Sequence, residues 1–216
     1  MAVLLPERKS YSRAEVIGDA VVHASGAAFA LIAVPVLVVA AVLVRGGIAP
    51  VAAVSVYGAC LLAMILFSAL YNTLGRRRWT ATLKRLDHSA IYAKIAGTYT
   101  PFAVLSGSHL WLLAGLWAAA LAGIALKLAS PDRWRRAGLV LCLAMGWAGL
   151  APGVGLVGGL PAPVLALILA GGVVYTAGVV FYLLDRLPFH YMIWHVMVLA
   201  ASAFLYAAVT VHVIAA

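Results

Sequence analysis

The last apolar segment of the chain opens with the residues Pro-Phe-His-Tyr-Met-Ile-Trp-His, which run from Pro188 to His195. Its two histidines, His190 and His195, have side chains suited to binding a metal ion or to transferring a proton near neutral pH. An ionisable side chain inside a membrane span is costly, so it is a functional hypothesis by default. The pair predicts a metal site where the chain enters its last span.

Other polar and ionisable side chains lie near the ends of three earlier apolar segments. They are Glu15, Asp19, His23, Ser68, Tyr71, Asn72, Asp87, His88 and Lys94. Glu15, Asp19 and His23 follow one another at i, i+4 and i+8, which places them on one face of a helix. For Glu15, Asp19 and His88, the alternative interpretation is that they are solvated residues at the level of the lipid head groups.

Asp87 and Lys94 are seven residues apart, which is two turns of a helix on nearly the same face. A carboxylate or an ammonium group next to hydrocarbon needs a partner. We therefore expect an ion pair between Lys94 and Asp87, with Asp19 as a further partner of Lys94.

The composition defines the class of protein that carries these residues. The chain has 216 residues, of which 66% are hydrophobic and only 10% are charged. About a quarter of the residues of a soluble domain are charged, so a soluble domain of this length could not cover so much apolar surface. The sequence predicts an integral membrane protein in contact with lipids.

Segments long enough to cross about 30 Å of hydrocarbon can be located along the whole chain. They run approximately over residues 21–44, 51–74, 87–106, 109–128, 136–152, 163–184 and 189–214. The loops between them are short, so we expect one domain over residues 1–216. The predicted fold class is all-α, a bundle of seven transmembrane helices.

The basic residues indicate how this bundle is oriented. With seven spans, 13 of the 15 Lys and Arg residues fall on one face of the membrane. They are Arg8, Lys9, Arg13, Arg76, Arg77, Arg78, Lys84, Arg85, Lys127, Arg133, Arg135, Arg136 and Arg186. The positive-inside rule then predicts a cytoplasmic N-terminus and an external C-terminus, with the polar side chains gathered in the cytoplasmic third. This bias and attraction to anionic lipids explain the net charge of +9 without a nucleic-acid partner.

The run Leu86-Asp87-His88-Ser89-Ala90-Ile91-Tyr92, with Ile95 to Phe102 after it, closely resembles the third-helix signature of haemolysin III proteins. These proteins are the bacterial branch of the progestin and adipoQ receptor family. Further matches are Glu15, Asp19, His23 and Gly26, the run Ser68-Ala-Leu-Tyr71, and the run Ile193-Trp194-His195-Val196. The resemblance covers nearly the whole chain. It implies a seven-helix bundle with a cytoplasmic N-terminus in a bacterial inner membrane.

The resemblance also implies a site. In the family, three histidines near the cytoplasmic side hold a zinc ion, one from the second helix and two from the seventh. The positions of Asp87 and Ser68 match the aspartate that orients a metal-bound water and the serine beside it. Three protein ligands and a water are the open, hydrolytic form of zinc. Amide hydrolysis of ceramide-type lipids is the activity attributed to the animal receptors.

This chain departs from the family at the zinc ligands. The second-helix histidine is Asn72 here, and the first histidine of the seventh-helix pair is Tyr191, which leaves only His195. His190 is i, i+5 from His195, about 140° away around the helix, so it is a poor replacement. Asp19 stands where the family has an asparagine. The family's upstream glutamate aligns with Glu15 or with Val16.

Three functions follow as hypotheses. The first is a haemolysin III-like membrane protein with a degenerate zinc site, which senses a lipid or small ligand or takes part in membrane homeostasis. In this interpretation it is not an enzyme and has no cofactor. The second is a zinc-dependent, ceramidase-like lipid amidohydrolase that uses His195 and Asp87. The third is a pore-forming cytolysin. The sequence names no substrate and gives no oligomeric state.

Overall fold

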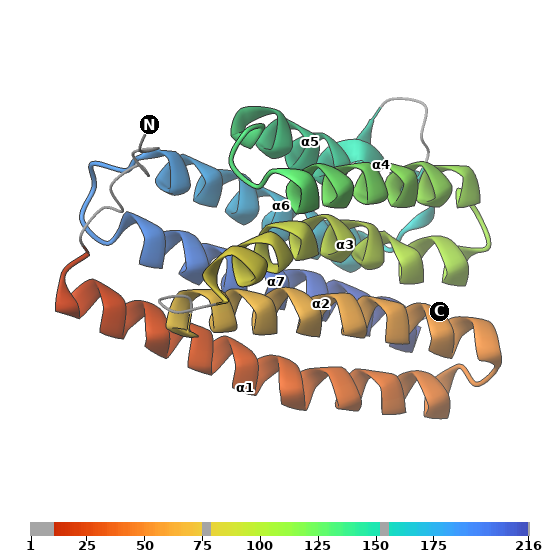
Figure 1. Ribbon diagram of the computed structural model, residues 1–216. Helices are drawn as coiled ribbons and strands as arrows, with labels where there is room; N and C mark the ends of the chain where they lie inside the picture. The colour runs from red at the N-terminus through yellow and green to blue at the C-terminus, as the bar shows by residue number, and fades with distance from the viewer. Residues whose placement is uncertain (1–10, 75–78, 152–155, 216) are drawn as a thin grey trace.

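The computed structural model describes residues 11–74, 79–151 and 156–215, and this part of the chain forms a bundle of seven α-helices (Figure 1). They are α1 (Arg13–Val44), α2 (Ile48–Leu74), α3 (Thr80–Ser106), α4 (Leu110–Ala129), α5 (Arg135–Trp147), α6 (Ala162–Leu183) and α7 (His190–Ala215). Two short 3-10 helices, η1 (Ala148–Leu150) and η2 (Leu156–Gly159), follow α5. The described residues contain no strand. The all-α prediction is confirmed, and each predicted segment contains a helix.

Helix α1 begins eight residues before its predicted span because a capping box fixes its start. The Ser12 hydroxyl accepts a hydrogen bond from the Glu15 backbone N–H at 3.2 Å, and the Glu15 carboxylate accepts one from the Ser12 N–H at 2.8 Å. The added turns carry Asp19 into the regular part of the helix. Its position relative to His23 is therefore set by helical geometry.

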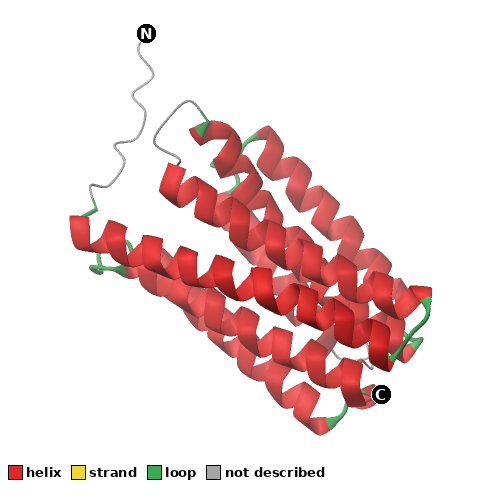
Figure 2. Ribbon diagram, turned by 90° about the horizontal axis from the view of Figure 1, so that it is seen from below, coloured by secondary structure: helices red, strands yellow, loops and turns green. Residues whose placement is uncertain are grey.

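Consecutive helices pack side by side along the chain, and α1 also packs against α7 (Figures 1 and 2). Helix α3 lies in the middle of the bundle, where it contacts α2, α4, α5 and α7. Two clusters of buried apolar side chains form the core. One is built around Leu37, Tyr57 and Leu61, and the other around Tyr92 and Leu116.

Helices α1 and α7 run in the same direction and are joined at both ends. At the start of α7, the Glu15 carboxylate accepts a hydrogen bond from the Phe189 backbone N–H at 2.8 Å. At its end, the Arg45 guanidinium donates to the carbonyl oxygens of His212 and Val213, each at 2.8 Å. Each charge meets the end of α7 that carries the opposite partial charge and the unpaired backbone groups. These contacts fix the register of α7 along α1.

Five of the helices, α1, α2, α4, α6 and α7, are long and apolar enough to cross a membrane. Helix α3 is long but carries Lys84, Arg85, Asp87 and Lys94. Helix α5 has only 13 residues and a length of about 20 Å, short of the predicted span 136–152. Many large apolar side chains of α1 face outwards, among them Ile32 at 68% exposure and Leu43 at 79%. The chain is an integral membrane protein of helical type.

The described basic residues of the predicted cytoplasmic face lie at one end of the bundle, the end where α1, α3, α5 and α7 begin. Arg8, Lys9 and Arg76 to Arg78 fall outside the described residues. At this end the Lys84 ammonium group lies 2.6 Å and 2.8 Å from the two carboxylate oxygens of Asp132. This hydrogen-bonded pair lowers the pKa of Asp132 below its usual value.

Candidate functional site

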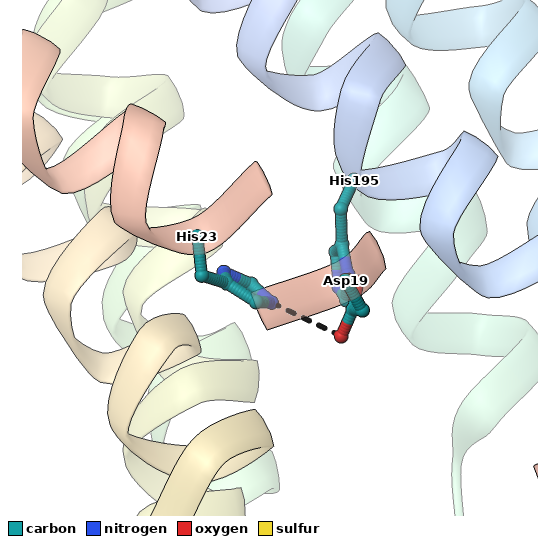
Figure 3. A group of neighbouring side chains, drawn as sticks. All are labelled: Asp19, His23 and His195. Carbon is teal, nitrogen blue, oxygen red and sulfur yellow. Dashed lines mark hydrogen bonds and ion pairs between the residues drawn. The ribbon is translucent and has the colours of Figure 1, made fainter. Parts of the chain in front are cut away.

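Asp19 and His23 from α1 meet His195 from α7 in a compact group of three side chains (Figure 3). The Nδ1 atom of His195 lies 2.5 Å from Asp19 Oδ1, and the Nε2 atom of His23 lies 3.4 Å from Asp19 Oδ2. The two imidazole rings have their centroids 4.4 Å apart, with 58° between the ring planes. One donor atom from each residue lies within 4.8 Å of the other two, a geometry that could hold a metal ion.

The group forms because α1 and α7 approach each other closely on either side of it. Gly18 and Gly26 face α7 before and after the group. A Cβ atom at Gly18 would lie 2.5 Å from Met192 Sδ, and one at Gly26 would lie 3.4 Å from Leu199 Cδ1. At Gly18 the clash would be with the flexible end of the Met192 side chain, and at Gly26 the contact would be an ordinary van der Waals one, so the two glycines leave room for side chains of α7 to pack closely on α1.

Both histidines of the group are buried, with His23 exposed to 6% and His195 to 8%. Asp19 is exposed to 16% of its side-chain surface. His23 Nε2 has no hydrogen-bond partner among the described residues, and its ion-pair contact with Asp19 is long. A buried imidazole nitrogen without a hydrogen bond costs free energy, so this atom is available to a ligand.

A cavity of about 270 Å³ opens from this group into the middle of the bundle. His23, His195, Ser68 and Asp87 line it, and most of its wall is apolar, contributed by side chains such as Phe102. Asp87 lies within hydrogen-bonding reach of Ser68, and close enough to His23 and Asp19 to interact with both electrostatically. A mostly apolar cavity with a small number of polar groups is the usual form of a small-molecule site.

Asn72 and Tyr191 occupy the two positions where the resemblance implies the other histidine ligands. The Asn72 side-chain nitrogen donates to the Ser68 backbone oxygen at 3.0 Å, and its distance to the Ser68 hydroxyl is 3.4 Å. The Tyr191 ring packs edge-on against His195, with centroids 4.4 Å apart. A neutral amide and a phenol are poor zinc ligands, so the family's three-histidine set does not fit the residues present here.

Four other predicted polar residues lie outside the group. Glu15 caps α1 and binds the Phe189 N–H. His190 is buried, and its ring nitrogens face the Phe181 carbonyl oxygen at 3.3 Å and the Tyr11 hydroxyl at 3.4 Å. The rings of Tyr71 and His88 pack edge-on, with centroids 6.3 Å apart. Because its ring nitrogens face Phe181 and Tyr11, His190 points away from His195, as its i, i+5 spacing requires.

The expected ion pair of Lys94 with Asp87 or Asp19 is wrong. Asp19 pairs with His23 and His195, and Asp132 pairs with Lys84, and no ion pair between described residues includes Lys94. Lys94 is 1% exposed, and its ammonium nitrogen lies 4.4 Å from the centroid of the Tyr175 ring, within cation–π distance. The seven-residue spacing gave the face of the helix correctly, but the long lysine side chain extends towards α6.

Sequence reasoning noticed Asp19 and His23 on one face but did not join them to His195 as a set of ligands. The signal was present, since Asp19 and His23 have the i, i+4 spacing and His195 opens a parallel helix. The family pattern does not include this set, because its ligand positions lie on the second and seventh helices. Tyr175, the ring over which Lys94 lies, had no sequence signal.

The helices and their buried polar group define a multi-pass helical membrane protein with a polar site inside the bundle. The family model described as "Haemolysin-III related" matches residues 13–206. "Hemolysin-3" of Bacillus cereus is 36% identical over 203 residues, which are 93% of this chain and 92% of the relative. "Hemolysin-3 homolog" of Bacillus subtilis (strain 168) is 33% identical over 194 residues, 88% of this chain and 90% of the relative. The chain belongs to the haemolysin III family, as its resemblance implied.

Proposed function

We propose that this haemolysin III family protein binds a membrane lipid or similar amphiphile in its central cavity, and that it senses this ligand as part of membrane homeostasis. One observation carries the proposal. Lys94, at 1% exposure, lines a mostly apolar cavity, and no carboxylate of the described residues lies within ion-pair distance of it. A buried ammonium group is costly without a counter-charge. An anionic head group would supply that charge, and the apolar wall would hold the acyl chain.

The Tyr175 ring supports this arrangement. It faces the Lys94 ammonium group on one side, and its hydroxyl is hydrogen-bonded to the Ser202 hydroxyl at 3.0 Å. The ring is thereby held in place, and it partly stabilises the cation when no ligand is bound. The proposed ligand would therefore add a counter-charge to a cation–π contact that Lys94 already makes.

The proposed topology has seven spans, a cytoplasmic N-terminus and a location in the bacterial cytoplasmic membrane. It is supported by the gathering of the described basic residues at the end where the odd-numbered helices begin. In this topology α3 is enclosed largely by neighbouring helices rather than by lipid alone. The cavity would then lie in the cytoplasmic half of the bilayer.

The test compares lipid retention by two lysine variants. The purified protein is incubated with vesicles of anionic phosphatidylglycerol or of zwitterionic phosphatidylcholine, re-isolated in detergent, and examined by native mass spectrometry. We expect the wild-type chain to retain the anionic lipid and Lys94→Met to retain roughly tenfold less of it. Lys84→Met, which removes a lysine at the surface of the same helix, serves as the matched control. Equal retention by both variants, or no preference for the anionic lipid, would refute the proposal.

A lipid amidohydrolase is the second candidate, because Ser68, Asp87 and His195 line the same cavity. In such an enzyme Asp87 would take a proton from a water as that water attacks the amide carbonyl carbon, and would return the proton to the amine nitrogen as the C–N bond breaks. Ser68 would orient Asp87 through its hydroxyl. The assay is release of free fatty acid from a ceramide-type lipid by purified protein in detergent. Release that is lost in Asp87→Asn would establish this function, and its lack in the wild type would exclude it for that lipid.

A further inference from the structure

A metal site built on different residues from those of the family can be assembled from α1 and α7. Zinc bonds to nitrogen and oxygen ligands are about 2.1 Å long, so two ligands at tetrahedral positions lie about 3.4 Å apart. The distance from His23 Nε2 to Asp19 Oδ2 is 3.4 Å. These two atoms are therefore already placed as neighbouring ligands of one ion.

His195 completes the set from the opposite helix. Its Nδ1 atom lies 2.5 Å from Asp19 Oδ1, which is a hydrogen-bond distance. An ion at this place would take the position of the shared proton, and the two atoms would have to separate by about 1 Å to reach the spacing of tetrahedral ligands. Small rotations of the two side chains provide that change, since they approach from separate helices (Figure 3).

A second observation points to a ligand independently of the spacing. His23 is buried, and its Nε2 atom has no hydrogen-bond partner among the described residues. This is the same atom that stands at the ligand distance from Asp19. A metal ion would satisfy its lone pair, which the protein itself leaves without a donor.

We propose that Asp19, His23 and His195 bind a divalent transition-metal ion of the zinc type between α1 and α7. Two imidazoles and one carboxylate form the donor set of many catalytic zinc sites, whereas magnesium and calcium prefer oxygen ligands alone. His195 thus keeps its role as a ligand, but its partners come from α1 instead of α2 and α7. Asp19 replaces the neutral amide that the family resemblance places at this position.

The surrounding charges favour such an ion. Two neutral imidazoles, one carboxylate and a divalent cation leave one positive charge, which is costly in the interior of a membrane protein. Asp87 interacts electrostatically with both His23 and Asp19, and its carboxylate would balance that charge. Because His23 and His195 also line the cavity, the coordination positions that remain would face it.

The experiment measures metal binding without any assay of activity. Protein purified in detergent is stripped with a chelator and titrated with Zn²⁺, and bound metal is counted by elemental analysis. We expect about one ion per chain, and affinity roughly 100-fold weaker in Asp19→Asn, His23→Gln and His195→Gln. Titration with Co²⁺ should give the visible absorption bands of a tetrahedral site with nitrogen ligands.

The controls separate this site from other histidines and from loss of folding. His190→Gln changes a buried histidine of α7 that bonds elsewhere, and it should bind zinc as the wild type does. The same holds for Asn72→Ala and Tyr191→Phe, which alter the positions of the family ligands. Circular dichroism of the metal-free variants should show wild-type helix content, because Asn and Gln keep the size of the side chains. Absence of binding, or zinc lost in Asn72→Ala or Tyr191→Phe but retained in Asp19→Asn, would overturn the proposal.

Discussion

Arg45 provides the sharpest test of how the two helices of the candidate site are held together. Its guanidinium donates two hydrogen bonds of 2.8 Å to the last turn of α7, at the carbonyl oxygens of His212 and Val213. We predict that Arg45→Met, which keeps the apolar part of the side chain, destabilises the protein and loosens α7 against α1. No other side chain of the described residues bonds these two oxygens, so the loss of the Arg45 hydrogen bonds leaves both carbonyl groups without a side-chain partner.

The magnitude follows from the contacts. A hydrogen bond with a charged partner contributes about 1.5–3 kcal/mol, and the interaction with the helix dipole about 0.3–1 kcal/mol. Arg45 is only half-buried, so solvent weakens both contributions, and we expect a total loss of about 2–3 kcal/mol. For a chain of this size that loss lowers the melting temperature by roughly 4–12 °C.

The assay is thermal unfolding of detergent-purified protein, followed by circular dichroism. Arg45→Lys should recover part of the loss, since an ammonium group reaches one carbonyl but lacks the planar fork. Arg136→Met is the matched control, because Arg136 is an exposed arginine of α5 for which the structure gives no hydrogen bond to another side chain. If Arg45→Met and Arg136→Met melt together, the contact between α1 and the end of α7 does not stabilise the bundle.

Three further predictions concern packing, pH and membrane leakage. Gly123→Ala should lower the free energy of unfolding by about 1–3 kcal/mol, because a Cβ atom there would lie 2.5 Å from the buried Tyr92 ring. Gly146→Ala is the control: its Cβ atom would meet nothing within 4 Å, so this change should be neutral or stabilising. Asp132 has a lowered pKa in the folded state, so its pair with Lys84 stabilises the protein at pH values above the ordinary carboxyl pKa of about 3.9, and this contribution disappears as the pH falls through the folded-state value. Lys84→Met should therefore lower the melting temperature slightly at pH 7 and not at about pH 2, and an equal effect at both would contradict this origin. Dye-filled liposomes should stay sealed at sub-micromolar protein, because the candidate polar residues gather at one end of the bundle; rapid leakage would instead support the cytolysin hypothesis.

The relation between sequence and structure is clearest at α1 and α3. The apolar runs predicted a helix in each place, because a membrane admits backbone only when its hydrogen bonds are satisfied within the segment. They did not predict the start of α1, which depends on the hydrogen bonds between Ser12 and Glu15. They also overestimated the fifth segment, because apolar composition continues past Trp147 while the regular helix ends there.

At the candidate site the sequence identified Asp19, His23 and His195 as residues of interest, and it identified the loss of two family ligands at Asn72 and Tyr191. The seven-residue spacing along one helix predicted an ion pair between Lys94 and Asp87. The structure directs Lys94 towards Tyr175 instead, since a flexible four-carbon side chain can reach a neighbouring helix. Spacing along a helix determines the face on which a residue lies, whereas tertiary packing determines where the charged end of a long side chain lies.

The sequence alone determined the class of the molecule, the approximate helices and the family, because these follow from hydrophobicity along the chain and from local motifs. Only the tertiary structure decided that His195 meets Asp19 and His23. That meeting depends on the packing of α1 against α7, where Met192 and Leu199 lie over Gly18 and Gly26, and on Glu15 and Arg45, which fix the register of the two helices. Residues 176 positions apart along the chain are brought to hydrogen-bonding distance by these contacts, and no periodicity within one helix could have shown it.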